Sequence, residues 1–258
     1  MCVSTGAAVP PDGHPDAGST QGLHARVLDG LGTAIAGGRT PVGALLYIDD
    51  LAAEYGVSRS VIRECLRVLA SMGLVESRRR VGTRICPREE WNVFDPQVIR
   101  WRLASDDRVG QLRSLTELRA AVEPEAAALA ALRGRLDEGS GLVALAAQMW
   151  SAGMEGDLDT FLRLDVEFHR RVLAGSGNEM FLKLSSLVGE VLSGRHQYGL
   201  MPHHPDELAL SLHADVAQAI QRREESLARE AMRRITVQAL EEMASIWDET
   251  TGSLHPTN

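Results

Sequence analysis

Four polar side chains in the C-terminal half have the types and the spacing to bind a ligand or a metal ion. Asp165 and His169 lie one helical turn apart, inside the apolar stripe of the segment around 157–174 rather than on its solvated face. His213 lies at the edge of the apolar stripe of the segment after Asp206. Arg119 and Glu123 lie at the margin of the apolar stripe of the segment after Arg108.

These side chains come from three segments, and helical bundles build ligand and metal sites from facing helices. An aspartate and two histidines are also a partial set of metal ligands. The alternative is an internal hydrogen-bond network with no ligand, because buried polar groups are usually paired within the protein. Both interpretations remain open on this pattern.

A second group of side chains, all arginines, suits a polyanion. Residues 49–86 read as a short helix, a turn, a second helix and a two-stranded hairpin, which is the order of a winged helix-turn-helix. Ser58 is placed to cap the second helix. Arg59, Arg63 and Arg67 recur every fourth residue and form one ridge. The opposite, inward stripe is Val61, Ile62, Cys65, Leu66 and Leu69.

Charge is strongly segregated around this motif. From Val57 to Arg88 there are eight arginines against only Glu64 and Glu76, a local balance of +6, whereas the whole chain carries −8, so the remainder carries −14. A helix of this kind fits the major groove of DNA, and an arginine-rich wing reaches the backbone or the minor groove. We therefore expect this end of the chain to bind double-stranded DNA rather than to be only a solvated basic surface.

The order of helices and strands along the sequence predicts a mostly α fold. It begins with an N-terminal winged helix-turn-helix that has a small β-hairpin wing, and an all-α bundle of six or seven helices follows. A helix over 23–36 precedes the motif, and the loop at 40–48 has room for a short strand joining the wing's sheet. Pro124 is expected to kink its helix or break it in two. The expected domains are a tail at 1–20, the DNA-binding domain at 21–88, a linker at 89–95, the helical domain at 96–250 and a tail at 251–258. The predicted helices of the bundle are 96–104, 107–133, 139–152, 157–174, 178–197, 206–222 and 224–248.

Composition excludes several classes of protein. With 44% hydrophobic but only 4% aromatic residues, the core must be mostly Ala, Leu and Val, which favours helices. Cys2, Cys65 and Cys86 show no paired spacing, which is typical of a reducing cytoplasm. We expect no signal peptide, and no apolar run approaches the roughly 20 residues needed to cross a bilayer.

Nucleophile-elbow, P-loop, dinucleotide-binding and zinc-protease motifs are also absent from the sequence, so an enzyme is not expected.

Over about residues 22–248 the sequence resembles transcriptional regulators of the GntR family, FadR subfamily, with an FCD effector domain. The segments that carry the resemblance are LAAEYGVSRSVIRECLRVLASMGLVE with its wing, WNVFDPQVIRW at 91–101, ELRAAVEPEAAALAA at 117–131, DVEFH at 165–169, GSGNEMF at 175–181 and LHADVAQAI at 212–220.

For the DNA-binding half, the resemblance implies contacts from Arg59 and Arg63 and from the wing tip. With their neighbours on the same helix, the expected DNA-contacting set is Arg59, Ser60, Arg63, Arg67, Arg79 and Arg80. Where many family members have an arginine in the first helix of the motif, this chain has Asp49. A different operator sequence is therefore expected.

For the helical half, the resemblance implies a ligand set of one aspartate and three histidines in the members that bind metal. Asp165, His169 and His213 match the first three, but the fourth position falls on Ile235. A complete site is not expected, although three ligands with water could hold a divalent ion such as zinc. The linker and the missing histidine resemble the members that respond to galactonate or gluconate, in which Arg119 matches the carboxylate-pairing position.

These features together predict a homodimeric, cytoplasmic repressor that a small carboxylate, such as a sugar acid of the aldonate type, releases from its operator. The expected ligand-binding residues are Arg119, Asp165, His169 and His213. Two alternatives remain: a metal-dependent hydrolase or lyase-like helical domain fused to a winged helix, and an architectural DNA binder with no effector.

Overall fold

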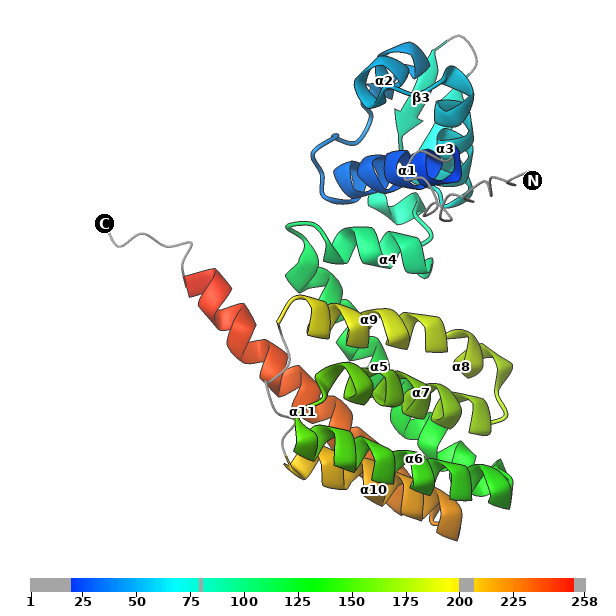
Figure 1. Ribbon diagram of the computed structural model, residues 1–258, viewed down its shortest axis with the longest axis vertical. Coiled ribbons are helices and arrows are strands. Elements are labelled where there is room, and N and C mark those ends of the chain that lie inside the picture. The colour runs from blue at the N-terminus through cyan, green and yellow to red at the C-terminus, as the bar shows by residue number, and fades with distance from the viewer. Residues whose placement is uncertain (1–19, 79–80, 200–206, 253–258) are drawn as a thin grey trace, which may run out of the picture. The chain divides into compact units, whose positions relative to one another are not determined.

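The computed structural model describes residues 20–78, 81–199 and 207–252, and the chain divides into two compact units between Asn92 and Val93 (Figure 1). Arg79 and Arg80 of the expected wing tip lie outside the described residues, as does the loop at 201–205. None of the described helices is both long and apolar enough to cross a membrane.

The N-terminal unit has the predicted order of elements. These are α1 (Thr20–Ala36), β1 (Leu45–Leu46), α2 (Ile48–Tyr55), α3 (Arg59–Ser71), β2 (Val75–Arg78), β3 (Gly82–Ile85) and a short 3-10 turn, η1 (Arg88–Glu90). Gly56 adopts a left-handed conformation with φ 64°, which allows the tight turn between α2 and α3. Ser58 then caps α3 by accepting a hydrogen bond from the Val61 amide. The winged helix-turn-helix is therefore confirmed.

The wing is part of a three-stranded antiparallel sheet in the order β1-β3-β2. Val75 pairs with Ile85 and Arg78 with Gly82 in the hairpin, while Leu45 pairs with Arg84 across the other edge of β3. The short strand in the 40–48 loop thus forms and extends the wing's sheet. Trp91, near the C-terminal end of this unit, is buried, and its indole donates a hydrogen bond to the Cys86 carbonyl.

The second unit is an all-α bundle, as predicted, but it contains eight helices in the part described. They are α4 (Pro96–Leu103), α5 (Arg108–Arg133), α6 (Leu136–Glu155), α7 (Leu158–Gly175), α8 (Glu179–Lys183), α9 (Ser185–Gln197), α10 (Glu207–Arg222) and α11 (Glu225–Gly252). The predicted count of six or seven is wrong because the expected helix at 178–197 is interrupted at Leu184. Asp95 caps the helix that begins at Pro96 by accepting a hydrogen bond from the Gln97 amide.

The long helix α5 is continuous through Pro124, so of the two expected effects, a kink or a break, the break is wrong. An interior proline costs about 3 kcal/mol through a lost hydrogen bond and a clash with the preceding turn. Here the helix packs against α4, α7, α9, α10 and α11, and this burial offsets the cost (Figure 1). The helix is buried on most sides just after the proline, where the buried residues are Ala126, Ala127, Ala128, Ala130 and Ala131.

The helix predicted at 139–152 continues past residue 152, so that Gly153 lies within α6. A Cβ atom at this position would lie 2.8 Å from Leu210 of α10. The glycine therefore permits α6 and α10 to approach closely, which offsets its low helix propensity. Sequence spacing alone does not contain this information, because the contact joins residues far apart in the chain.

Candidate functional site

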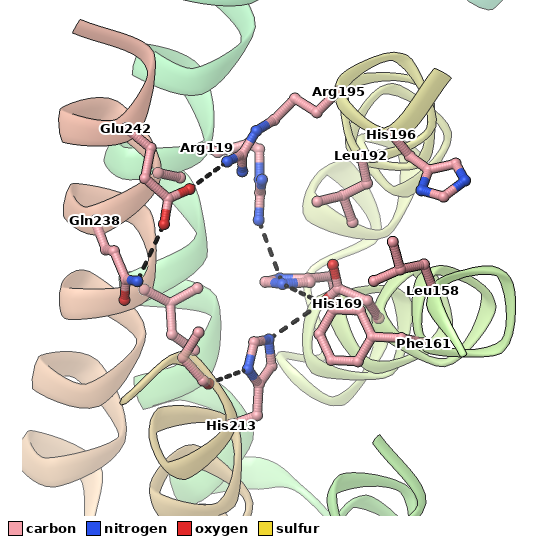
Figure 2. A pocket seen from close by; sticks show the side chains of 14 residues that line it. Arg119, Leu158, Phe161, His169, Leu192, Arg195, His196, His213, Gln238 and Glu242 are labelled. Carbon is pink, nitrogen blue, oxygen red and sulfur yellow. Dashed lines mark hydrogen bonds and ion pairs between the residues drawn. The ribbon is translucent and has the colours of Figure 1, made fainter. Parts of the chain in front are cut away.

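A cavity of about 70 Å³ lies inside the helical unit, lined by residues of α5, α7, α9, α10 and α11 (Figure 2). One part of the lining is apolar and includes Leu158, Phe161, Leu192 and Ile235. The other part is polar and charged, and includes Arg119, Asp165, His169, Arg195, His213 and Glu242. The four residues expected to bind a ligand therefore line one cavity, although they come from three helices.

Asp165 and the two histidines form the centre of the polar part. The Asp165 Oδ1 atom lies 3.3 Å from Nε2 of His169 and 3.1 Å from Nε2 of His213. Phe168, fully buried, makes edge contacts with both imidazole rings, at 5.9 and 5.1 Å between ring centroids. The phenyl ring therefore holds both rings in place from one side.

Arg119 contacts this group both directly and by way of Glu123, which lies one turn further along α5. Its Nε donates to Glu123 Oε1 at 2.7 Å, and its Nη2 lies 3.3 Å from His169 Nε2. The second oxygen of Glu123 is 2.7 Å from His169 Nδ1. Glu123 thus links the arginine to the histidine, a role that the sequence analysis did not assign to it.

The network strongly shifts the pKa values of its members. Burial alone would raise the pKa of Glu123, but the charges of Arg119 and His169 outweigh it and hold this pKa at about 2. For His169, burial would lower the pKa, but Glu123 and Asp165 raise it to about 9. Burial is likewise outweighed at Asp165, where hydrogen bonds from both histidines keep the pKa well below its usual range. Both carboxyl groups are therefore ionised at neutral pH.

The donor set fits a divalent cation. Ligand atoms of Asp165, His169 and His213 all lie within 4.8 Å of one another. The Nδ1 atom of His213 faces the Ala209 carbonyl at 2.6 Å, and that of His169 faces Glu123, so both Nδ1 atoms carry a proton. A ring with one proton would present a bare Nε2 to the Asp165 carboxylate, so a second proton or a cation must lie between the two acceptors. The raised pKa of His169 supplies that second proton on its ring, and a cation at this site would take the proton's place. Protein carboxylates and carbonyls orient metal-binding histidines in the same way.

The fourth position of this set is apolar. Ile235 of α11 lines the cavity, as expected for the residue in place of the fourth ligand, and its side chain has no donor atom. Three protein ligands with water in the remaining position is the arrangement of an open zinc site.

Sequence reasoning missed Arg195 of α9 and Glu242 of α11. Both line the cavity, and they contact each other at 2.5 Å. Only Arg195 is fully buried, with 5% of its surface exposed. The spacing of α9 does carry a signal that was not used, because Arg195 continues the buried stripe of Leu187, Val188, Val191 and Leu192 one turn further along.

On the DNA-binding unit, the arginine ridge of α3 lies on the exposed face, as does Ser60. The Arg59 Nε atom lies 2.6 Å from the Asp49 carboxylate of α2, and Arg67 is 3.5 Å from Glu64. In the wing, Arg78 and Arg84 both pair with Glu76. The arginine ridge is thus available to a polyanion, with Asp49 beside its first member.

Comparison with known proteins agrees with this arrangement. Residues 23–85 match the family "Bacterial regulatory proteins, gntR family", and residues 114–238 match the FCD domain. The uncharacterized HTH-type transcriptional regulator YieP of Escherichia coli is 27% identical over 171 residues, covering 66% of this chain and 73% of YieP. The galactonate operon transcriptional repressor of the same organism is 29% identical over 167 residues, covering 64% of this chain and 72% of the repressor.

Among solved structures, Lar, which controls the expression of the Listeria monocytogenes agr system, shares the fold with a TM-score of 0.52. It is 17% identical, and the match covers 87% of this chain and 97% of Lar. The matched families and the two Escherichia coli relatives are regulators of transcription, so the interpretation as a hydrolase or lyase is set aside. The chain belongs to the GntR family and is a DNA-binding transcriptional regulator whose second domain is an FCD domain.

Proposed function

We propose that the protein is a homodimeric repressor whose FCD domain binds a small carboxylate, such as a sugar acid, and that this binding releases operator DNA. The observation that carries the proposal is the cavity in which Arg119, Asp165, His169 and His213 converge. The similarity to a galactonate operon repressor supports the same chemical class.

The cavity suits an acid that carries hydroxyl groups. A guanidinium group attracts a carboxylate through its charge and its hydrogen-bond donors, and Arg119 brings this charge to the lining while Glu123 engages its Nε and Nη2 atoms. The Asp165 carboxylate accepts hydrogen bonds and the imidazoles accept or donate them, so they can satisfy the hydroxyl groups of an aldonate. The remaining wall of Leu158, Phe161 and Leu192 covers the carbon chain.

In the metal-bound form, Asp165, His169 and His213 would hold a divalent ion such as zinc. The ion would supply a positive charge and a coordination position for an oxygen atom of the acid. Glu123 orients His169 from the Nδ1 side of its ring, and Arg119 in turn holds Glu123 through its Nε atom.

DNA binding is proposed for Arg59, Ser60, Arg63 and Arg67 of α3, together with Arg79 and Arg80 of the wing. One recognition helix contacts only a few base pairs, so a dimer that reads two half-sites supplies the affinity and specificity an operator requires. Release requires the acid to bind the arrangement without DNA more tightly than the DNA-bound one.

Fluorescence anisotropy with an operator selected from a random DNA library tests the proposal. D-galactonate, D-gluconate and other small carboxylates are added to the protein–DNA complex. We expect one of them to release the DNA, and we expect Arg119→Ala to retain DNA binding while losing the response. Arg113→Ala, at an exposed position of the same helix, is the control.

Because Arg119→Ala leaves Glu123 without its main partner, Arg119→Lys is a second variant, which keeps the charge but lacks the planar fork. Circular dichroism checks that both variants are folded. Indifference of the parent protein to every acid in the panel would instead support an architectural DNA binder without an effector.

A further inference from the structure

An ion pair crosses the cavity between α9 and α11. The Arg195 Nη2 atom donates to Glu242 Oε2 at 2.5 Å, and Gln238 of α11 donates to the other oxygen of Glu242 at 3.1 Å (Figure 2). The two charged side chains differ in environment, because 6% of the Arg195 side chain is exposed against 31% of the Glu242 side chain. The carboxylate is therefore partly in water, whereas the guanidinium is not.

Arg195 is incompletely satisfied by this pair. Its Nε atom is buried and has no hydrogen-bond partner, although a buried N–H group without an acceptor is costly. Burial and the nearby charge of Arg119 lower the pKa of Arg195, and Figure 2 shows both guanidinium groups in the cavity lining. The region between the two arginines therefore favours an additional anionic acceptor.

We propose that the carboxylate of the effector binds Arg195 and displaces Glu242, so that Glu242 acts as a built-in competitor for the site. This inference rests on the proposed function, since it requires an acid to enter the cavity. The carboxylate of Glu242 occupies the position that a carboxylate of the ligand takes when it is bound.

The exchange follows from the unequal burial of the pair. Glu242 can move into water at little cost, because it is already partly solvated, whereas Arg195 must keep a partner inside the protein. A free carboxylate can approach the side of the guanidinium that carries both Nε and Nη2, which satisfies the Nε atom that Glu242 leaves unpaired. Arg195 thus exchanges one hydrogen bond for two.

The exchange also breaks a link between two helices. Without the bond to Glu242, α9 and α11 lose a charged contact across the cavity. Helix α9 packs on α4, where Glu190 pairs with Arg100 at 2.5 Å and Gly194 lies against Leu103. Since α4 directly follows the chain boundary between the two units, a change in α9 acts on the helix nearest in sequence to the DNA-binding unit.

The experiment uses the full chain and isothermal titration with the acids of the panel above, D-galactonate first. We expect Glu242→Gln to bind the acid more tightly than the parent by roughly fivefold, the scale of one partly exposed ion pair. Arg195→Gln should reduce binding strongly and Arg195→Lys partly. Glu241→Gln, at the exposed neighbouring position, is the control and should bind like the parent.

Each outcome decides a specific point. If the parent binds an acid but Glu242→Gln binds it equally or more weakly, the competitor role of Glu242 is overturned while the proposed function stands. If neither the parent nor Glu242→Gln binds any acid, this inference and the proposed function both fall. A gain in affinity cannot come from a damaged fold, so the Glu242 variant decides the question even if Arg195→Gln fails to fold.

Discussion

Asp49 of α2 lies 2.6 Å from the Nε atom of Arg59, the first residue of the recognition helix α3. Both side chains are about two-thirds exposed, at 66% and 68%, so the contact lies on the surface that carries the arginine ridge. A carboxylate at this position repels DNA phosphates, but it also holds the guanidinium group of Arg59 at its Nε atom. The pair therefore places one negative charge beside the arginine ridge and holds Arg59 through its Nε atom.

The first prediction concerns this pair. Replacing Asp49 by Asn removes a negative charge from the DNA-binding surface, so affinity for random DNA should rise and the logarithmic salt dependence should steepen by up to about one unit. Preference for the selected operator over random DNA should fall, because Arg59 is no longer oriented. Anisotropy titrations at several salt concentrations measure both effects, and Asp50→Asn is the matched control. Equal behaviour of the two variants would contradict the prediction.

The second prediction concerns Arg63, an exposed residue in the middle of the ridge on α3. Its replacement by Ala should weaken operator binding by about 1–3 kcal/mol, the typical contribution of an arginine that contacts a base. The thermal unfolding temperature should remain that of the parent, since the side chain is not part of the core. Arg113→Ala, on α5 of the helical unit, should leave DNA binding unchanged. An unaltered operator affinity in Arg63→Ala would remove this residue from the DNA-contacting set.

The third prediction concerns the metal site. Replacing Ile235 by His places a fourth donor on the cavity wall, so affinity for zinc should rise by at least about tenfold, as completing a coordination shell adds a metal–ligand bond. His213→Ala should lower the affinity instead. Zinc titration against a chromophoric chelator, with elemental analysis of the purified proteins, measures the change. No difference between parent, Ile235→His and His213→Ala would show that zinc does not bind at these residues.

The fourth prediction concerns Phe168, which is fully buried between the two imidazole rings and the core of the FCD domain. Its replacement by Ala should lower the free energy of unfolding by about 3–5 kcal/mol, through lost burial and the cavity left behind. Urea unfolding followed by circular dichroism measures this cost. Phe181→Ala, at a partly buried position of α8, should cost clearly less. Comparable losses for both would mean that Phe168 is not the central packing residue.

Local patterns in the sequence were sufficient for the DNA-binding half. The turn at Gly56, the cap at Ser58 and the inward stripe from Ile62 to Leu69 all involve residues close together in the chain. Periodicity also places Asp165 and His169 on the inward face of α7, since residues one turn apart share a face.

Tertiary packing decided the rest. The continuity of α5 through Pro124 depends on helices that pack around it, and Gly153 lies within α6 because Leu210 approaches from α10. The pairing of Arg195 with Glu242 likewise joins side chains 47 residues apart. Spacing along one helix determines which face a residue occupies, but only the packed bundle determines which faces meet, because that depends on contacts between segments distant in the chain.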